Sequence, residues 1–196
     1  MFVQILQGQV RDGDELNRQV ARWRSELKPG ASGYLGSTGG VTSDGRGITL
    51  VRFESEAAAR ANSERPEQAA WWSDAEKAFD GEVTFHDSSD VETVAGGGSD
   101  EAGFVQVIQG RTKDQAEMRR LGRQMEDQLG KSRPEILGML VAWHGDGDFT
   151  QAVYFTSVEA ARKAEAASQD DEAGREMMEL LDGQPTFFDL ESPDLD

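Results

Sequence analysis

The sequence contains no cysteine, which excludes disulfide bonds, thiolate metal sites and a cysteine nucleophile. It contains only two histidines, too few for a His-rich metal site, and we expect neither a metal nor a cofactor. It also lacks a G-x-S-x-G nucleophile elbow, a P-loop, a Rossmann fingerprint and an H-E-x-x-H zinc motif. The sequence therefore carries no catalytic signature of its own.

Basic residues are scarce, because 20 Lys and Arg stand against 37 Asp and Glu, for a formal net charge of −17. Such an acidic surface repels the phosphates of nucleic acids and anionic lipids, so we expect neither as a partner. The sequence also shows no basic leader and no apolar run long enough to span a membrane. These features predict a cytoplasmic protein.

What the sequence does contain is a long internal repeat. The stretch FVQILQG at residues 2–8 returns as FVQVIQG at residues 104–110, an offset of 102 residues. An offset of this length indicates a duplicated domain rather than a solenoid of short repeats. The same offset, without a gap, relates VRF at 51–53 to VYF at 153–155, and AAR at 58–60 to AAR at 160–162.

The repeat defines the expected domain organisation. We predict one domain over residues 1–87 and a similar one over residues 103–190. Residues 88–102 are rich in glycine and acidic residues and lack apolar periodicity, which predicts a flexible linker. Residues 191–196 are expected to form a C-terminal tail.

Each repeat has the pattern of a small α+β domain. Residues 2–8 are apolar β-formers, as in a buried strand. Asp12 and Glu15 form a capping box ahead of an amphipathic helix that Pro29 ends. The following elements are strands over 34–41 and 48–53, helices over 56–62 and from Pro66, and a strand over 82–87. This β-α-β-β-α-β order is the ferredoxin-like pattern.

Three stretches give the chain a family resemblance: the opening Phe2-Val3-Gln4 strand, residues 51–60 (VRFESEAAAR), and RPEQAAWW at 65–72 ahead of VTFH at 83–86. In these the chain resembles the dimeric α/β-barrel superfamily, which includes antibiotic-biosynthesis monooxygenase-like domains. More narrowly, it resembles a tandem form found among uncharacterised actinobacterial proteins. The resemblance implies that the two sheets pair within one chain into an intramolecular dimeric α/β-barrel. Such a pseudo-dimer leaves the molecule free to be a monomer or a homodimer.

The superfamily spans several activities: cofactor-independent oxidation of aromatic polyketides, haem binding and degradation, and muconolactone-type isomerisation. Fold alone does not choose among them. Haem-degrading members use an Asn, a Trp and a His, and Asn62, Trp71 or Trp72, and His86 supply these residue types here. Gln4, however, occupies the first strand, where that family places its Asn, and this departure argues against haem chemistry.

Comparison of the two repeats indicates where a site lies. The first repeat has Tyr34, Arg52, Trp71, Trp72 and His86 where the second has Ile136, Tyr154, Ala173, Gly174 and Phe188. Aromatic walls with a few polar groups suit an apolar or aromatic small molecule, so we predict a ligand cavity in the first repeat. The candidate ligand-binding residues are Gln4, Tyr34, Arg52, Trp71, Trp72 and, from the second repeat, Gln106, and the candidate catalytic residue is His86.

Some orientations can be stated in advance. Trp71 and Trp72 point about 100° apart on a helix, so one is expected in the core and the other in a pocket or an interface. His86 faces away from Phe85 on its strand, and it points toward the barrel interior, as a general base or haem ligand, if Phe85 packs under the helices. His144 is expected at the surface. A buried Gln4 or Gln106 needs partners, either at the seam between the repeats or on a ligand.

Three functions remain open at this point. The first is a small-molecule-binding protein, with the further possibility of a cofactor-independent monooxygenase-like activity. The second is a non-catalytic interaction or structural module whose barrel is filled by side chains. The third is haem binding.

Overall fold

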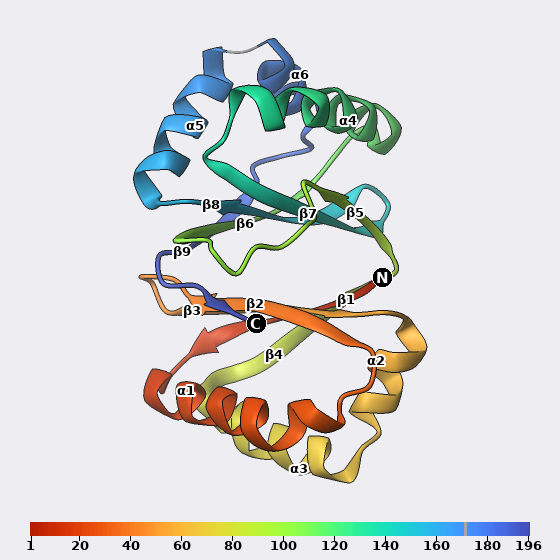
Figure 1. Cartoon of the computed structure of the whole chain (residues 1–196), viewed down its shortest axis with the longest axis vertical. Coiled ribbons are helices and arrows are strands. Elements are labelled where there is room, and N and C mark those ends of the chain that lie inside the picture. Colours follow the sequence, from red (N-terminus) through yellow and green to blue (C-terminus); the bar gives the residue numbers. More distant parts are fainter. Residues whose placement is uncertain (171) are drawn as a thin grey trace. The chain divides into compact units, whose positions relative to one another are not determined.

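The protein is described by a computed structural model over residues 1–170 and 172–196, with side chains at all of these except 125, 127–132 and 168–170. It forms two compact units (Figure 1). Unit one comprises Met1–Ser89 together with Asp194–Asp196, and unit two comprises Asp90–Pro193. Each unit contains a five-stranded antiparallel sheet, so the predicted duplication holds at the level of structure.

The sheet of unit one has the strand order β10-β2-β3-β1-β4. The strand predicted over residues 82–87, β4, starts three residues earlier, at Phe79. A register shift after Gln7 lets Asp80 and Phe79 pair with Gln9 and Val10. The strands are β1 (Phe2–Val10), β2 (Tyr34–Val41), β3 (Arg46–Phe53), β4 (Phe79–Ser88) and β10 (Asp194–Leu195).

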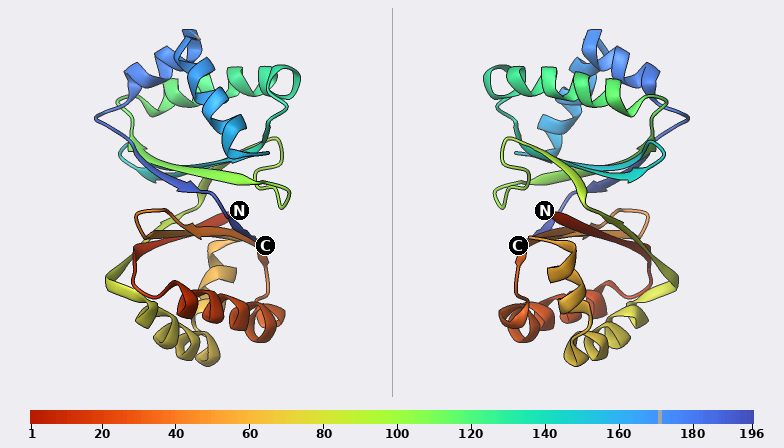
Figure 2. Two further views of the ribbon diagram at one scale, coloured as in Figure 1. Left: turned by 90° about the vertical axis from the view of Figure 1, so that its left-hand side faces the viewer. Right: turned by 90° about the vertical axis from the view of Figure 1, so that its right-hand side faces the viewer.

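Helices cover one face of this sheet, as Figure 1 and the two turned views of Figure 2 show. They are α1 (Gly13–Arg22), α2 (Glu56–Ser63) and α3 (Pro66–Ala75). The predicted N-cap is present, since the Asp12 carboxylate accepts a 2.9 Å hydrogen bond from the backbone N–H of Glu15. Beyond α1 the chain continues through a π-helical turn over Trp23–Leu27 and a 3₁₀ turn over Lys28–Gly30.

Unit two repeats the arrangement with the strand order β5-β7-β8-β6-β9. Its strands are β5 (Asp90–Val94), β6 (Phe104–Arg111), β7 (Ile136–Gly145), β8 (Asp148–Phe155) and β9 (Thr186–Leu190). Its helices are α4 (Gln115–Ser132), α5 (Val158–Asp170) and α6 (Glu172–Leu180). The predicted tandem ferredoxin-like α+β fold is confirmed, whereas the pairing of the two sheets into a barrel stays a prediction.

Two segments that the sequence describes as linker and tail contain strands. Within residues 88–102, β5 pairs with β7, and within residues 191–196, β10 pairs with β2. The open edges of β2 and β7 offer unpaired N–H and C=O groups, and a segment of almost any composition can satisfy them. A strand made in this way does not need the apolar periodicity on which the linker prediction depended.

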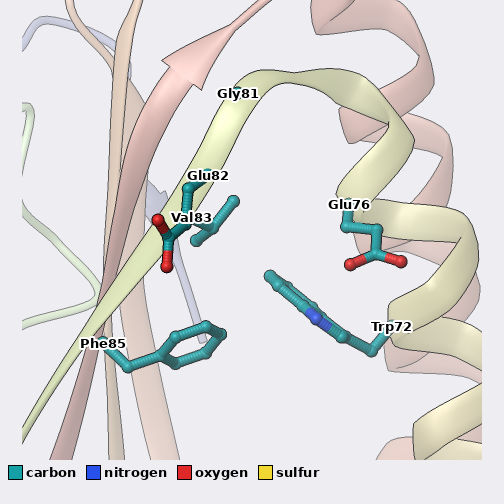
Figure 3. Close-up of a pocket in the computed structure, with 6 residues that line it drawn as sticks. All are labelled: Trp72, Glu76, Gly81, Glu82, Val83 and Phe85. Atoms are coloured by element: carbon teal, nitrogen blue, oxygen red, sulfur yellow. The ribbon is translucent and has the colours of Figure 1, made fainter.

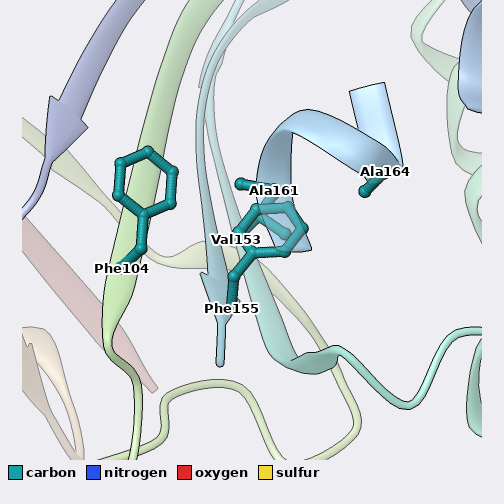
Figure 4. Close-up of a cluster of buried hydrophobic side chains, with 5 residues drawn as sticks. All are labelled: Phe104, Val153, Phe155, Ala161 and Ala164. Carbon is teal, nitrogen blue, oxygen red and sulfur yellow. The ribbon is translucent and has the colours of Figure 1, made fainter. Parts of the chain in front are cut away.

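The two units build the same hydrophobic core at equivalent positions. In unit two, Phe104, Val153, Phe155, Ala161 and Ala164 pack α5 onto the sheet, and each is at most 6% exposed (Figure 4). In unit one, Phe2, Phe53 and Ala59 form the corresponding cluster between α2 and the sheet, with Val51 packed against it. The helix-covered face of each sheet is thereby identified.

Candidate functional site

Six aromatic rings lie in continuous contact on the helix-covered side of unit one, and we call them the aromatic row. Neighbouring ring centroids are 5.0–6.5 Å apart, within the range of favourable aromatic pairs. One end is buried, since Phe53 is 1% exposed, and the other is open, since Phe85 is 51% exposed. The order of contact is Phe53, Tyr34, Trp23, Trp71, Trp72 and Phe85.

Two indole groups of the row join α1 and its continuation to α3. The Trp71 Nε1–H donates a 2.8 Å hydrogen bond to the backbone carbonyl of Gln19 in α1. The Trp23 Nε1–H donates a 2.9 Å bond to the side-chain carbonyl of Gln68 in α3. Trp71 therefore acts in packing the helices together, while its neighbour Trp72 points elsewhere, as expected for adjacent residues on a helix.

Trp72 lines a cavity of about 270 Å³ between α3 and β4. In Figure 3 the Trp72 indole extends from the helix and the Phe85 ring from the strand, and the two point toward one another. Their centroids are 5.3 Å apart with an interplanar angle of 68°. The remaining lining residues are Glu76, Gly81, Glu82 and Val83.

The helix and the strand that flank the cavity are joined by a short connection. A single 3₁₀ turn, Glu76–Ala78, follows α3, and β4 starts at the next residue. The Ala78 carbonyl accepts backbone hydrogen bonds from Arg11 and Asp12 at 2.8 and 3.1 Å, which fix this junction to the end of β1. Gly81 then adopts φ +80°, a conformation that glycine accepts without strain.

Two acidic side chains lie at this cavity. The carboxylates of Glu76 and Glu82 make no hydrogen bond or ion pair with any other residue that the structure describes. Sequence reasoning missed both, because exposed carboxylates are common in so acidic a chain. The signal available was the comparison of repeats, since Met178 and Gln184 replace them 102 residues later.

Near the buried end of the aromatic row, the hydroxyl of Tyr34 is engaged in a hydrogen bond within unit one. Its hydroxyl donates a 2.9 Å hydrogen bond to the Asp196 carboxylate, which also pairs with Lys28. Burial, and after it the hydrogen bond to Asp196, raises the pKa of Tyr34 above its ordinary value. Arg24 completes the contact by pairing with Asp194. These contacts attach β10 to unit one.

Arg52 and His86 lie on the other face of the same sheet. Phe85 contacts Trp72 on the helix-covered side, so the alternation of a strand directs His86 to the opposite side. His86 is exposed there and does not line the α3–β4 cavity with Trp72. Arg52 also faces away from the helices, and its Nη2 donates a 3.3 Å bond to the backbone oxygen of Asp196.

Gln106 has its partners inside unit two. Its side-chain NH₂ donates to Glu165 of α5 at 2.7 Å and to Asp189 of β9 at 3.0 Å, and the residue is 5% exposed. It thus holds α5 against the sheet. A ligand contact of Gln106 stays a prediction. Gln4 occupies the equivalent position on β1 between Val51 and Asp87.

His144 is half-buried, in contrast to the surface position expected from sequence. Strand β7 continues to Gly145, one residue past His144, so the histidine stays within the sheet. Its Nε2 lies 3.0 Å from the Thr150 hydroxyl of β8, which also accepts a 3.2 Å bond from Gln109.

Two further observations bear on the kind of site. Among the residues with described side chains, no three His, Asp or Glu side chains are grouped as a metal ion would require. No helix within the described part of the chain is long and apolar enough to cross a membrane.

No protein-family model matches the sequence, and no curated protein is found to be similar. Solved structures do match along the whole chain. A proposed monooxygenase of Fusobacterium nucleatum has a TM-score of 0.75 at 6% identity, covering 100% of this chain and 93% of that one. A second, from Lactobacillus acidophilus, has a TM-score of 0.70 at 12% identity, covering 100% and 98%.

An anthrone oxidase-like protein is similar as well, with a TM-score of 0.68 at 11% identity, covering 99% of this chain and 92% of that one. The chain therefore shares its two-unit α+β fold with two proposed monooxygenases and an anthrone oxidase-like protein. At these identities the likeness defines the fold, and the activity has to be argued from the site.

Proposed function

We propose that the protein binds a small aromatic molecule in the cavity between α3 and β4 of unit one. The observation that carries this proposal is the pair of contacting rings, Trp72 and Phe85, that together form an aromatic wall of a cavity of about 270 Å³. An aromatic ring left half exposed, as Phe85 is, forgoes hydrophobic stabilisation that a ligand stacked on it would recover.

Unit two supports the proposal by contrast. It retains a phenylalanine, Phe187, where unit one has Phe85, but it has Gly174 in place of Trp72. Gly174 has no side chain that could line such a region as Trp72 does. The duplicated chain thus keeps one unit with the aromatic pair and one without it, which suits a single binding site in unit one.

We further propose that a bound aromatic compound is oxidised by O₂ without a cofactor. Glu76 and Glu82 place carboxylates beside the aromatic walls, where one could accept a proton from an activated CH₂ group. The electron-rich carbanion then reduces O₂, so that CH₂ becomes C=O and the second oxygen atom leaves as water. The shared fold of two proposed monooxygenases and an anthrone oxidase-like protein supports this reaction class.

The binding proposal is tested by titrating tryptophan fluorescence with 1-naphthol and anthrone. We expect saturable quenching in the wild type and a loss of affinity of about tenfold or more in Trp72→Leu and Phe85→Leu. Trp71→Phe is the matched control, because Trp71 packs against α1 and does not line the cavity. A folded wild type that responds to neither compound would favour a non-catalytic interaction module.

The oxidation proposal needs a separate readout. Oxygen consumption with anthrone is measured in the wild type and in Glu76→Gln and Glu82→Gln. We expect consumption that falls in at least one variant while naphthol binding persists. Binding without any oxygen consumption would restrict the protein to a binding role.

A further inference from the structure

We propose that the molecule recognised at the α3–β4 cavity is an aromatic cation, an arylammonium compound rather than a neutral or anionic one. This inference rests on the proposed binding function and adds the charge class of the ligand.

The aromatic walls suit a positive charge. Trp72 and Phe85 are inclined by 68°, so their rings form two sides of a corner rather than a flat stack. The faces of aromatic rings carry negative potential, and Trp attracts cations most strongly. A cationic group placed in this corner meets negative potential on both sides.

Elsewhere in this protein, ring faces are already covered by its own basic side chains. The guanidinium of Arg119 lies 4.9 Å from the Trp143 ring centroid, and that of Arg162 lies 5.5 Å from the Phe104 centroid. Within the described chain, neither Trp72 nor Phe85 has such a cation. Neither ring is therefore already engaged with a cation of the chain, and the half-exposed Phe85 ring leaves surface open to one from outside.

The two carboxylates at the cavity also lack a partner among the described basic side chains. Asp74, near the end of α3, is neutralised by Arg22 at 3.1 Å and by Lys77 at 2.9 Å. Glu76 and Glu82, by contrast, have no ion-pair partner among the residues that are described. Two carboxylates that form no ion pair with a described residue, beside an aromatic corner, attract a cation and repel a carboxylate or a phosphate.

Unit two lacks all three of these residues at the equivalent positions. It has Gly174, Met178 and Gln184 where unit one has Trp72, Glu76 and Glu82. The second repeat therefore lacks one aromatic face and both negative charges. Glu82→Gln in unit one is accordingly a substitution that the same fold already carries at the equivalent position.

The test compares two phenols of the same shape and different charge by isothermal titration calorimetry. They are 4-hydroxyphenyltrimethylammonium and its neutral isostere 4-tert-butylphenol. We expect the wild type to bind the cation about tenfold more tightly, with an affinity that falls as salt is added. Glu76→Gln and Glu82→Gln should each weaken binding of the cation and leave binding of the neutral phenol unchanged.

Glu67→Gln is the matched control, because Glu67 lies on α3, the helix of Trp72, pairs with Arg65 and does not line the cavity. It should leave the preference for the cation intact. Equal or tighter binding of the neutral phenol would overturn the charge inference and leave aromatic binding standing. Failure of both phenols to bind the folded protein would overturn the proposed function and this inference together.

Discussion

The hydroxyl of Tyr34 and the carboxylate of Asp196 are joined by a 2.9 Å hydrogen bond, although 162 residues separate them in the chain. Through this bond the added strand β10 contacts the aromatic row, because the Tyr34 ring also packs on Trp23 at 5.0 Å. At the far end of that row, Trp72 and Phe85 line the cavity. Attachment of β10 and the shape of the cavity thus depend on one set of rings.

Removing the Tyr34 hydroxyl tests this attachment. Tyr34→Phe keeps the ring contacts but deprives the half-buried Asp196 carboxylate of a donor, and we expect a loss of about 1–2 kcal/mol in the free energy of unfolding. Urea denaturation measures it. In an Asp196→Asn background the same substitution should cost less, and an equal cost in both backgrounds would contradict the coupling.

The contribution of Asp196 depends on pH. Burial on its own raises the pKa of Asp196, but the hydrogen bonds from Lys28 and Tyr34 outweigh it, and the pKa lies below its ordinary value. A carboxyl whose pKa is depressed by folding stabilises the protein fully above its unfolded pKa, near 4, and that stabilisation is lost as pH falls through the folded value.

The measurement is the free energy of unfolding of the wild type and of Asp196→Asn between pH 7 and pH 2. The wild type should be the more stable at pH 7, and the difference should shrink below about pH 4. A difference that is constant over this range would show that ionisation of Asp196 is not what stabilises the contact.

The two equivalent glutamines should respond differently to substitution. Gln106→Ala leaves Glu165 and Asp189 without their buried donor, and we expect a cost of about 1–3 kcal/mol. Gln4→Ala should cost less, because unit one has Ser63 where unit two has Glu165, and Ser63 bonds to the Ala59 carbonyl instead. Chemical denaturation of both variants checks the order, and the reverse order would refute this explanation.

His86 and Trp72 should separate in their effects on binding. The Trp72 indole lies against the face of β4 that α3 covers, whereas His86 lies on the opposite face. His86→Ala should therefore leave the affinity for 1-naphthol unchanged, while Trp72→Leu should reduce it. Fluorescence titration of the two variants side by side is sufficient. A loss of affinity in His86→Ala would place the ligand on the face opposite the helices.

Most of the fold follows from local patterns. The Asp12 cap, the Pro66 start of α3 and the apolar strand at residues 2–8 are determined by residues close in sequence, and all three are present. Strands β5 and β10 could not be predicted in this way. The cause is that the edges of β7 and β2, far along the chain, decide their conformation.

The candidate site was less accessible from sequence. The enrichment of aromatic residues in the first repeat is visible, but a strand presents alternate residues to two faces, and only the Phe85–Trp72 contact tells which face His86 occupies. Glu76 and Glu82 resemble the many other acidic residues of the sequence, and only the fold places them beside Trp72 and Phe85. Residue types were therefore predictable, and their grouping was not.

The two added strands have a consequence for how this gene can be divided. Glu92 of β5 pairs with Val141, and Asp194 of β10 pairs with Gly39. Asp194 lies 102 positions after Glu92, and Val141 lies 102 positions after Gly39, so the two pairings are equivalent. Each repeat, as written in the sequence, thus encodes the edge strand that completes the sheet built from the other. A gene fragment ending at residue 102 would encode β5 without its partner and leave β2 uncovered. The smallest piece of this protein that satisfies its own backbone is the whole tandem, not either repeat.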